Sequence, residues 1–137
     1  MTRRRPVARS TITFAAADGG GARPVIKAFN NIYFKSLLEK GQPPGTPGRV
    51  ALPVAGDRPD AKAKVMRLVD ELGFDPVDGG GLEDSWRQQP GTPCYTRDLD
   101  GVRLKDALAA ADRGRIPEYR RAAEDALKGR LGARRPR

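Results

Sequence analysis

The sequence predicts an α/β fold whose elements follow in the order βαβαβαα. A nearly all-apolar run, VIKAFN, precedes a short helical segment that ends at Gly41. A strand–helix–strand unit follows over residues 49–80, and its strands should be parallel because about a dozen residues, far more than a hairpin loop needs, separate them. Two amphipathic helices complete this order.

The first strand is expected over Val25–Asn30, where apolar residues dominate as they do in a strand that is covered on both faces. Tyr33–Lys40 has the pattern of a helix. The GQPPGTPG segment after it contains too much Pro and Gly for regular structure. Upstream, Thr11–Phe14 has the weak alternation of a short strand.

The strand–helix–strand unit has the clearest pattern in the chain. Val50–Val54 is expected to be a buried strand, with Pro53 at a bulge or beside an unpaired edge. Asp57 or Asp60 can cap the following helix, and Pro59 suits its first turn. The buried face of this helix is predicted to consist of Ala61, Val65, Leu68, Val69 and Leu72.

Gly73 should end that helix before a second strand, Phe74–Val77, which a right-handed crossover joins to the first. A further helix should begin after a capping Asp98 or Asp100, and the last one at Ile116 and Pro117. The apolar positions of the former are Val102, Leu104, Ala107, Leu108 and Ala111. Those of the latter are Tyr119, Ala122, Ala123, Ala126 and Leu127.

The net charge of +9 comes from the two ends of the chain. Residues 1–23 carry five Arg and one Asp, residues 128–137 carry one Lys and four Arg, and residues 24–127 hold 16 basic and 16 acidic side chains. Proteins that bind nucleic acid usually gather Lys and Arg on one face of the fold. We therefore expect a basic leader (1–23) that is disordered or unrelated to the rest, a domain (24–127) without a nucleic-acid-binding face, and a basic tail (128–137).

Residue composition restricts the chemistry. The chain has no His, so it lacks the usual general base near neutral pH and the commonest metal ligand, and no metal site is predicted. Its single cysteine, Cys94, fits a reducing compartment, and nothing in the sequence offers a base that would make it a nucleophile. No apolar run approaches the ~20 residues of a membrane span, and no signal-peptide core follows the Arg-rich start, so we expect a cytoplasmic protein.

Two glycine clusters, Gly19–Gly21 and Gly79–Gly81, are interpreted as turns and not as phosphate-binding loops. Neither has the G-x-G-x-x-G spacing of a dinucleotide-binding loop. After the second cluster, Glu83 and Asp84 would place negative charge at the start of a helix, where a phosphate would have to bind.

Two segments are candidates for a functional site, and each has a structural alternative. Asn30 and Asn31 would follow a buried parallel strand, where open α/β sheets bind ligands, or Asn30 would simply cap the next helix. The 85–98 segment, SWRQQPGTPCYTRD, is either a functional loop rich in aromatic and hydrogen-bonding side chains or a surface loop that Trp86 holds to the core.

The segments VIKAFNNI, VALPVAGDRPDAKAKVMRLVDELGFDPVDGG and LEDSWRQQPGTPCYTRDLD resemble the NADPH-dependent coenzyme F-420 (deazaflavin) reductase family, to which the cytosolic domain of the six-transmembrane ferric reductases is related. The likeness covers about residues 24–113 and depends on the order and spacing of the three segments. It implies the second half of a Rossmann-type NAD(P)-binding domain. Residues 1–23 match nothing in the fingerprint half with its G-x-G-x-x-G, so a truncated chain, or one read from a misplaced start, is expected.

The resemblance also implies a cofactor and a reaction. The residues assigned to the nicotinamide end of NADP are Ala28, Phe29, Asn30 and Asn31. The residues assigned to the side of the hydride acceptor, a deazaflavin or a flavin, are Arg87, Gln88 and Gln89. Hydride transfer in this family relies on aligning two rings and excluding water, which agrees with the absence of His. Activity is expected only when the missing nucleotide-binding half is supplied.

Two further expectations concern partners. The alternative function is a non-enzymatic binding module whose basic tails contact nucleic acid or acidic proteins. In addition, Val25–Asn30 would lack its upstream neighbour, leaving an open strand edge through which the chain could self-associate. Thr11–Phe14 could cover this edge only as an antiparallel hairpin partner, because the connection between them is too short for a parallel crossover.

Overall fold

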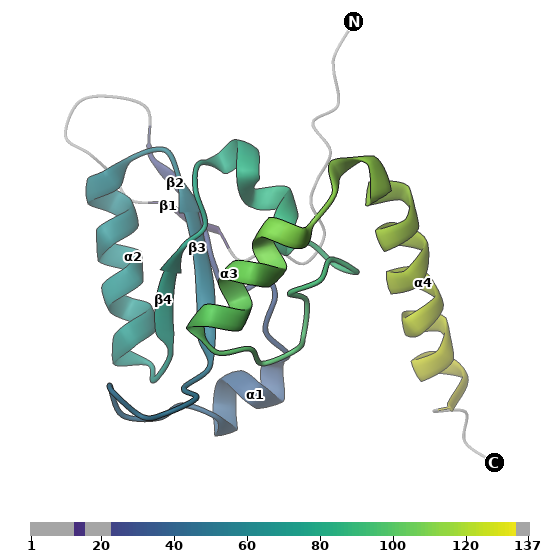
Figure 1. Ribbon diagram of the computed structural model, residues 1–137, viewed down its shortest axis with the longest axis horizontal. Coiled ribbons are helices and arrows are strands. Elements are labelled where there is room, and N and C mark those ends of the chain that lie inside the picture. Colours follow the sequence, from purple (N-terminus) through teal and green to yellow (C-terminus); the bar gives the residue numbers. More distant parts are fainter. Residues whose placement is uncertain (1–12, 16–22, 134–137) are drawn as a thin grey trace, which may run out of the picture.

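The computed structural model describes residues 13–15 and 23–133. Its strands are β1 (Thr13–Ala15), β2 (Val25–Lys27), β3 (Ala51–Gly56) and β4 (Asp75–Asp78). Its helices are α1 (Phe34–Glu39), α2 (Pro59–Glu71), α3 (Gly101–Ala110) and α4 (Ile116–Ala133), with 3₁₀ helices η1 (Leu82–Gln88) and η2 (Arg113–Arg115). The described strands form one sheet in the order β1-β2-β3-β4. Helix α2 packs on the sheet at one side, η1 and α3 pack on it at the other, and α4 projects away from it (Figure 1).

The unit β3–α2–β4 confirms the α/β class and the parallel pairing predicted for it. Helix α2 buries Ala61, Val65 and Val69 as predicted, whereas Leu72 is 49% exposed. Gly73 follows the helix with a φ of +106°, a conformation that favours glycine, so the predicted stop is confirmed. The predicted cap is wrong, because Arg58 occupies the N-cap without a side-chain hydrogen bond.

Two apolar clusters lie on opposite faces of β3. On the α2 side, the buried residues are Ile26, Ala28, Phe29, Leu52, Val54, Ala61, Val65, Val69 and Phe74. On the α3 side, they are Ala51, Val77, Cys94 and Leu104. Pro53 has no N–H to donate. Strand β2 pairs with Ala55 and Gly56 of β3 and not with Pro53, so the prediction that Pro53 lies beside an unpaired edge is confirmed.

Strand β2 differs from its prediction in length and direction. It covers Val25–Lys27 and runs antiparallel to β3, with Ile26 opposite Gly56. The reason is the connection between β2 and β3. Helix α1 has only six residues and lies beyond the ends of the strands, not across a face of the sheet (Figure 1). The chain therefore re-enters the sheet at the same end at which β2 leaves it, and β3 runs in the opposite direction. Placing Asn30 and Asn31 at the carboxyl end of a parallel strand was therefore wrong.

After Lys27 the chain moves away from β3, and residues 96–99 lie in the space between them. The Thr96 N–H donates to the Asn31 carbonyl at 2.7 Å, and the Ala51 N–H donates to the Leu99 carbonyl at 2.8 Å. Thr96 and Asp98 both have positive φ, at 57° and 50°. These backbone bonds hold the turn after β2, which carries Asn30 and Asn31, against the 85–98 segment.

One buried guanidinium, that of Arg49, ties the strand–helix–strand unit together. Its Nε donates to the carbonyls of Gln42 at 2.8 Å and Gly73 at 3.1 Å. Its Nη1 donates to the carboxylates of Asp70 at 2.7 Å and Asp75 at 2.9 Å, and Nη2 to the Asp70 carbonyl at 2.8 Å. The Arg49 side chain is 2% exposed, so these bonds hold the end of α2, the start of β4 and the loop before β3 in one place.

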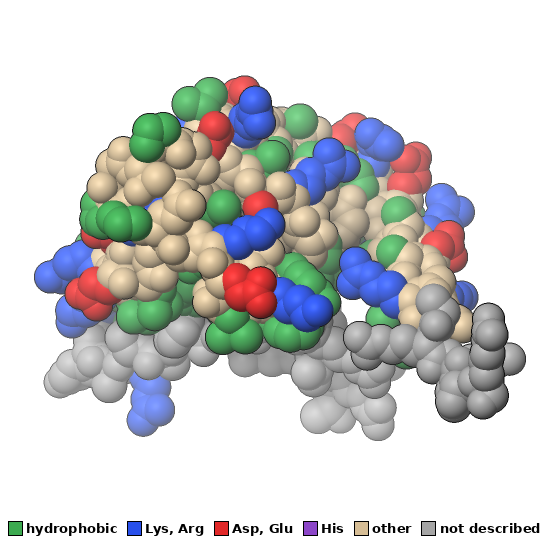
Figure 2. All heavy atoms as spheres, turned by 90° about the horizontal axis from the view of Figure 1, so that it is seen from below, with side chains coloured by type: hydrophobic (Ala, Val, Ile, Leu, Met, Phe, Trp, Pro, Cys, Tyr) green, Lys and Arg blue, Asp and Glu red, His purple; other side chains and the backbone are tan. Residues whose placement is uncertain are grey.

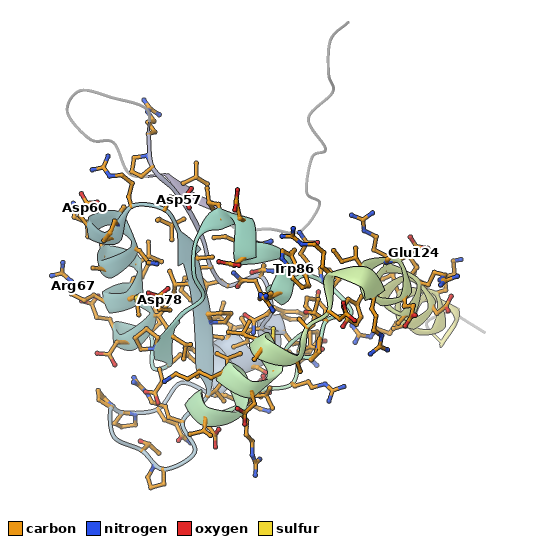
Figure 3. The ribbon with its side chains drawn as sticks, turned by 45° about the horizontal axis from the view of Figure 1, so that its top comes forward. Asp57, Asp60, Arg67, Asp78, Trp86 and Glu124 are labelled. Carbon is orange, nitrogen blue, oxygen red and sulfur yellow. The ribbon has the colours of Figure 1, made fainter. Side chains whose placement is uncertain are left out.

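We predict that Arg49→Ala lowers the free energy of unfolding by about 2–4 kcal/mol, because it leaves buried carbonyl groups without donors. Chemical denaturation measures this loss. Arg49→Lys should recover only part of it, since one ammonium cannot replace a planar donor that reaches several groups. Arg67→Ala, on the outer face of α2 (Figure 3), is the matched control and should change stability by less than about 0.5 kcal/mol. Equal stability of the Arg49 and Arg67 variants would contradict this role.

Strand β1 covers the outer edge of β2. It pairs antiparallel with it, Phe14 opposite Ile26, which is the hairpin arrangement that the sequence allowed. The open β2 edge on which the predicted self-association depended is therefore paired in the described structure. The rest of the predicted leader, residues 1–12 and 16–22, lies outside the described residues.

Self-association remains the prediction for a chain without β1. Deleting residues 1–22 should expose the β2 edge and convert a single species of 14.9 kDa into dimers or larger aggregates at tens of micromolar, measured by sedimentation. Deleting residues 134–137 instead removes basic charge without touching the sheet, and should leave the sedimentation unchanged. A monomeric deletion variant with a cooperative thermal transition would show that β2 needs no cover.

Candidate functional site

Two polar side chains from β2 and its following turn contact one face of η1. Ile26 is buried in the α2-side cluster, so the next residue, Lys27, faces the opposite side of the sheet, where η1 lies. The Lys27 Nζ donates to the Ser85 carbonyl at 3.1 Å. The Asn30 Nδ2 donates to the Gln88 carbonyl at 2.6 Å. We call these two segments, residues 27–31 and 85–88, the polar site.

The structure rules out the capping interpretation of Asn30. Helix α1 begins after Tyr33, which makes no side-chain cap bond, and Asn30 does not cap it. Asn30 instead joins residues 58 positions apart in the sequence. Ser85 and Gln88 lie one turn apart on η1, where residues at i and i+3 eclipse, so their carbonyls present one face with a separation of about 6 Å.

The polar site concentrates buried atoms that have no hydrogen-bond partner. In the described part of the chain these are Asn30 Oδ1, Asn31 Oδ1, Trp86 Nε1, Gln88 Oε1 and Asp98 Oδ1. All but the last belong to the polar site. A buried polar group without a partner costs about 1–3 kcal/mol, and such groups are usually satisfied by protein or by bound molecules. Their concentration makes the polar site the candidate functional site of the described residues.

The backbone of the polar site is also held in an uncommon conformation. Phe29 has a φ of 61°, which side chains other than Gly, Asn and Asp rarely adopt. Its ring is buried in the α2-side cluster, while Asn30 and Asn31 turn toward η1 and the 85–98 segment. Such strain persists where the surroundings fix it and often accompanies function.

The three residues predicted for the hydride acceptor occupy different environments. Arg87 donates to the Leu108 and Ala111 carbonyls at 3.0 and 3.3 Å, so it caps the end of α3, and its guanidinium stacks on the ring of Trp86 with Cζ 4.7 Å from the centre. The side chain of Gln88 is almost fully buried, inside the polar site. Gln89, the residue that follows η1, faces a groove on the outer surface.

This groove lies between α4 and residues 89–97 and has a volume of about 860 Å³. Its walls include Pro90, Tyr95, Ala122, Ala123, Ala126 and Leu127. Its charged residues are Arg97, Arg120, Glu124 and Arg130. Trp86 lies between η1 and the beginning of α4, where the Arg113 guanidinium also covers its ring with Cζ 5.4 Å from the centre (Figure 3). The Trp86 ring is thus covered by two guanidinium groups, those of Arg87 and Arg113.

The second glycine cluster is a turn, as predicted, and the amides of Gly80, Gly81 and the following Leu82 are already bonded to carboxylates. The Gly80 N–H donates to Asp78 at 2.8 Å, Gly81 N–H to Asp84 at 3.3 Å, and the Leu82 N–H to Asp57 at 3.1 Å. These carboxylates occupy the positions a phosphate would need. Gly19–Gly21 lies outside the described residues.

Three further observations concern nucleic-acid, metal and membrane binding by the described residues. Basic and acidic side chains are interspersed over the face shown in Figure 2, without a single basic patch on that face. Among residues 13–15 and 23–133, no three His, Cys, Asp or Glu side chains gather as metal ligands would. None of the helices in these ranges is long and apolar enough to span a membrane.

Sequence reasoning missed two members of the site. Lys27 stood within an apolar run and gave no sign that it faces η1 and not water. Ser85 contributes only its carbonyl, for which no residue type gives a signal. The alternation of side chains along β2, once Ile26 is assigned to the core, was the signal that could have placed Lys27.

Cys94 is buried at 1% exposure, and burial raises the pKa of its thiol to about 11. At pH 8 the thiolate is then about one molecule in a thousand, against roughly a quarter for an ordinary cysteine. We predict that iodoacetamide alkylates the native chain at least about a hundredfold more slowly than the chain in denaturant, measured by mass spectrometry. Equal rates would mean that the thiol is accessible and not part of the α3-side cluster.

Comparisons with known proteins give relatives but no function. No protein-family model matches the chain. The protein YjhV of Escherichia coli strain K12 is 46% identical over 72 residues, which are 53% of this chain and 53% of YjhV. The crystal structure of hypothetical protein SMa0349 from Sinorhizobium meliloti is similar with a TM-score of 0.48 and 36% identity, over 54% of this chain and 36% of that one. The chain thus spans about half the length of YjhV, and neither name states an activity.

Proposed function

We propose that this chain provides the nicotinamide-binding side of an NADP-dependent oxidoreductase of the coenzyme F-420 reductase type. The observation that supports it most is the meeting of the two residue sets assigned from the resemblance. Asn30, from the nicotinamide set, bonds Gln88, from the acceptor set, at 2.6 Å across 58 positions of sequence. Both residues carry buried amide oxygens without partners.

The unpartnered atoms fit the carboxamide of a nicotinamide ring. The amides of Asn30, Asn31 and Gln88 leave three oxygens that can only accept hydrogen bonds, and Trp86 Nε1 can only donate one. A primary carboxamide offers two N–H donors and one acceptor oxygen. It can therefore bond to oxygens of the polar site and to the indole of Trp86, whereas a purely anionic ligand would leave the oxygens unsatisfied.

The described residues do not fit the adenosine end of the cofactor and its phosphates. The first turn of α2 carries Asp60, and the amides of Gly80, Gly81 and Leu82 are bonded to three carboxylates. Helix N-termini bind phosphates when their amides are open and their charge is positive, and here neither holds. The proposal is therefore a half-site, and the part that binds the adenosine end must come from another segment or another chain.

NADPH, when bound, would supply the hydride from its reduced nicotinamide ring. The residues of this chain hold that ring and exclude water. Ala28 and Phe29 are buried in the α2-side cluster and fix the backbone that carries Asn30 and Asn31. The groove beside Gln89 is the proposed place of the deazaflavin or flavin acceptor. A volume of about 860 Å³ lies within the range of about 300–1,000 Å³ usual for ligand pockets.

Nicotinamide mononucleotide tests the half-site directly. We expect weak binding, with a dissociation constant on the order of millimolar, and chemical-shift changes in ¹⁵N–¹H spectra at residues 27–31 and 85–89. Adenosine 2′,5′-bisphosphate, the other end of NADP, should give no changes there. NADPH itself should bind no more tightly than about 10 μM by calorimetry, because its adenosine end finds no site.

A matched pair of variants provides the control. Asn30→Leu removes the amide of the polar site and should abolish the shifts, while Gln42→Leu alters an exposed amide in the loop before β3 and should keep them. A dissociation constant for NADPH well below 10 μM would show that the chain binds the whole cofactor. Shifts that occur with the adenosine compound and not with the nicotinamide compound would refute the proposal.

A further inference from the structure

The Lys27 ammonium is buried and has no acidic partner among the described residues. The residue is 6% exposed, and its Nζ bonds a neutral group, the Ser85 carbonyl, at 3.1 Å. Other lysines of the chain that make ion pairs meet carboxylates: Lys40 meets Asp98 at 2.7 Å, and Lys62 meets Asp78 at 2.9 Å. Buried charges in proteins are normally paired, because desolvation of an unpaired charge is costly.

The electrostatics of Lys27 agree with an absent counter-ion. Burial lowers the pKa of the Lys27 amine, and no neighbouring carboxylate opposes this effect. The acidic side chains of η1 are turned to other groups: Asp84 accepts from the Gly81 N–H and lies 4.0 Å from the Arg87 guanidinium, while Glu83 is exposed. An anion at Lys27 would therefore meet an uncompensated positive charge.

The position of Lys27 connects this charge to the unpartnered amides. The Ser85 carbonyl that it contacts and the Gln88 carbonyl that Asn30 contacts lie one turn of 3₁₀ helix apart, about 6 Å. One small molecule can thus reach the ammonium with an anionic group and the amides with a neutral polar group.

We propose that Lys27 is the anion-binding residue of the polar site and that it holds the phosphate attached to the nicotinamide riboside. The nature of the ligand rests on the proposed function, but the anion site itself rests on the burial and the missing counter-ion of Lys27. Asn30, Asn31 and Gln88 then hold the uncharged end of the same molecule. Lys27 binds and positions the ligand and takes no proton in this role.

The experiment compares nicotinamide mononucleotide with nicotinamide riboside, which is the same molecule without its phosphate. The native chain should bind the mononucleotide at least about tenfold more tightly, the usual effect of one hydrogen bond to a charged group, measured by NMR titration. Lys27→Gln should bind both compounds equally. Lys64→Gln, at an exposed position of α2, is the matched control and should keep the tenfold preference.

A second readout uses the native chain and needs no variant to fold. The pKa of the Lys27 amine, followed through its ¹³Cε shift, should rise when nicotinamide mononucleotide is added and stay unchanged with the riboside. A lysine that only pins β2 to η1 would not respond in this way. If Lys27→Gln does not fold, Lys27→Arg keeps the charge and should retain the preference for the phosphate compound.

The possible results separate the two proposals. Equal affinity for both compounds with an unchanged Lys27 pKa overturns the anion site and leaves the nicotinamide half-site in place. Lys27-dependent binding of ribose 5-phosphate as tight as that of the mononucleotide supports the anion site and refutes the recognition of nicotinamide. Failure of all three compounds to bind overturns both.

Discussion

The structure depends on one constraint: the side chains of Lys27, at the end of β2, and of Asn30, in the turn that follows, must both contact the same face of η1. Lys27 reaches the Ser85 carbonyl and Asn30 reaches the Gln88 carbonyl, so the chain has to part from β3 directly after Lys27. This explains why β2 is three residues long although apolar residues continue to Phe29. It also explains the insertion of residues 96–99, which supply the backbone bonds that a longer β2 would have made.

The strand–helix–strand unit and the polar site differ in how their buried polar groups are satisfied. Arg49 satisfies backbone carbonyls and two carboxylates at one end of the strand–helix–strand unit, and all of its bonds lie at that end. The polar site has buried acceptors without donors and an ammonium without an anion. A protein tolerates such unsatisfied groups where a rigid frame holds them and where binding later satisfies them. Arg49 is therefore a structural cation, whereas Lys27 is the cation that we propose binds a ligand.

The sequence predicted what depends on local pattern and missed what depends on distant partners. Helical spacing and Gly73 fix α2, and Asp100 caps α3 through the Arg103 N–H as expected. The direction of β2 could not be predicted, because an apolar run looks the same in a parallel and an antiparallel strand. The role of Arg49 was not predicted, because its carboxylate partners lie 21 and 26 positions away. Of the site, Asn30 and Gln88 were identified separately, but only the fold brought them together.

Under the proposed function, the hairpin at the sheet edge bears on how a complementing half could bind. Such a half would bring a strand to the outer edge of β2, and in this chain β1 already pairs with that edge. A strand edge has one set of free N–H and C=O groups, so an incoming strand and β1 cannot both pair with it. A nucleotide-binding half would have to displace β1, as a donated strand does when it completes a sheet. Three residues of antiparallel pairing are a small barrier to such an exchange. Strand β1 is thus best understood as a local cover that protects the β2 edge and that a longer, better-matched strand can replace.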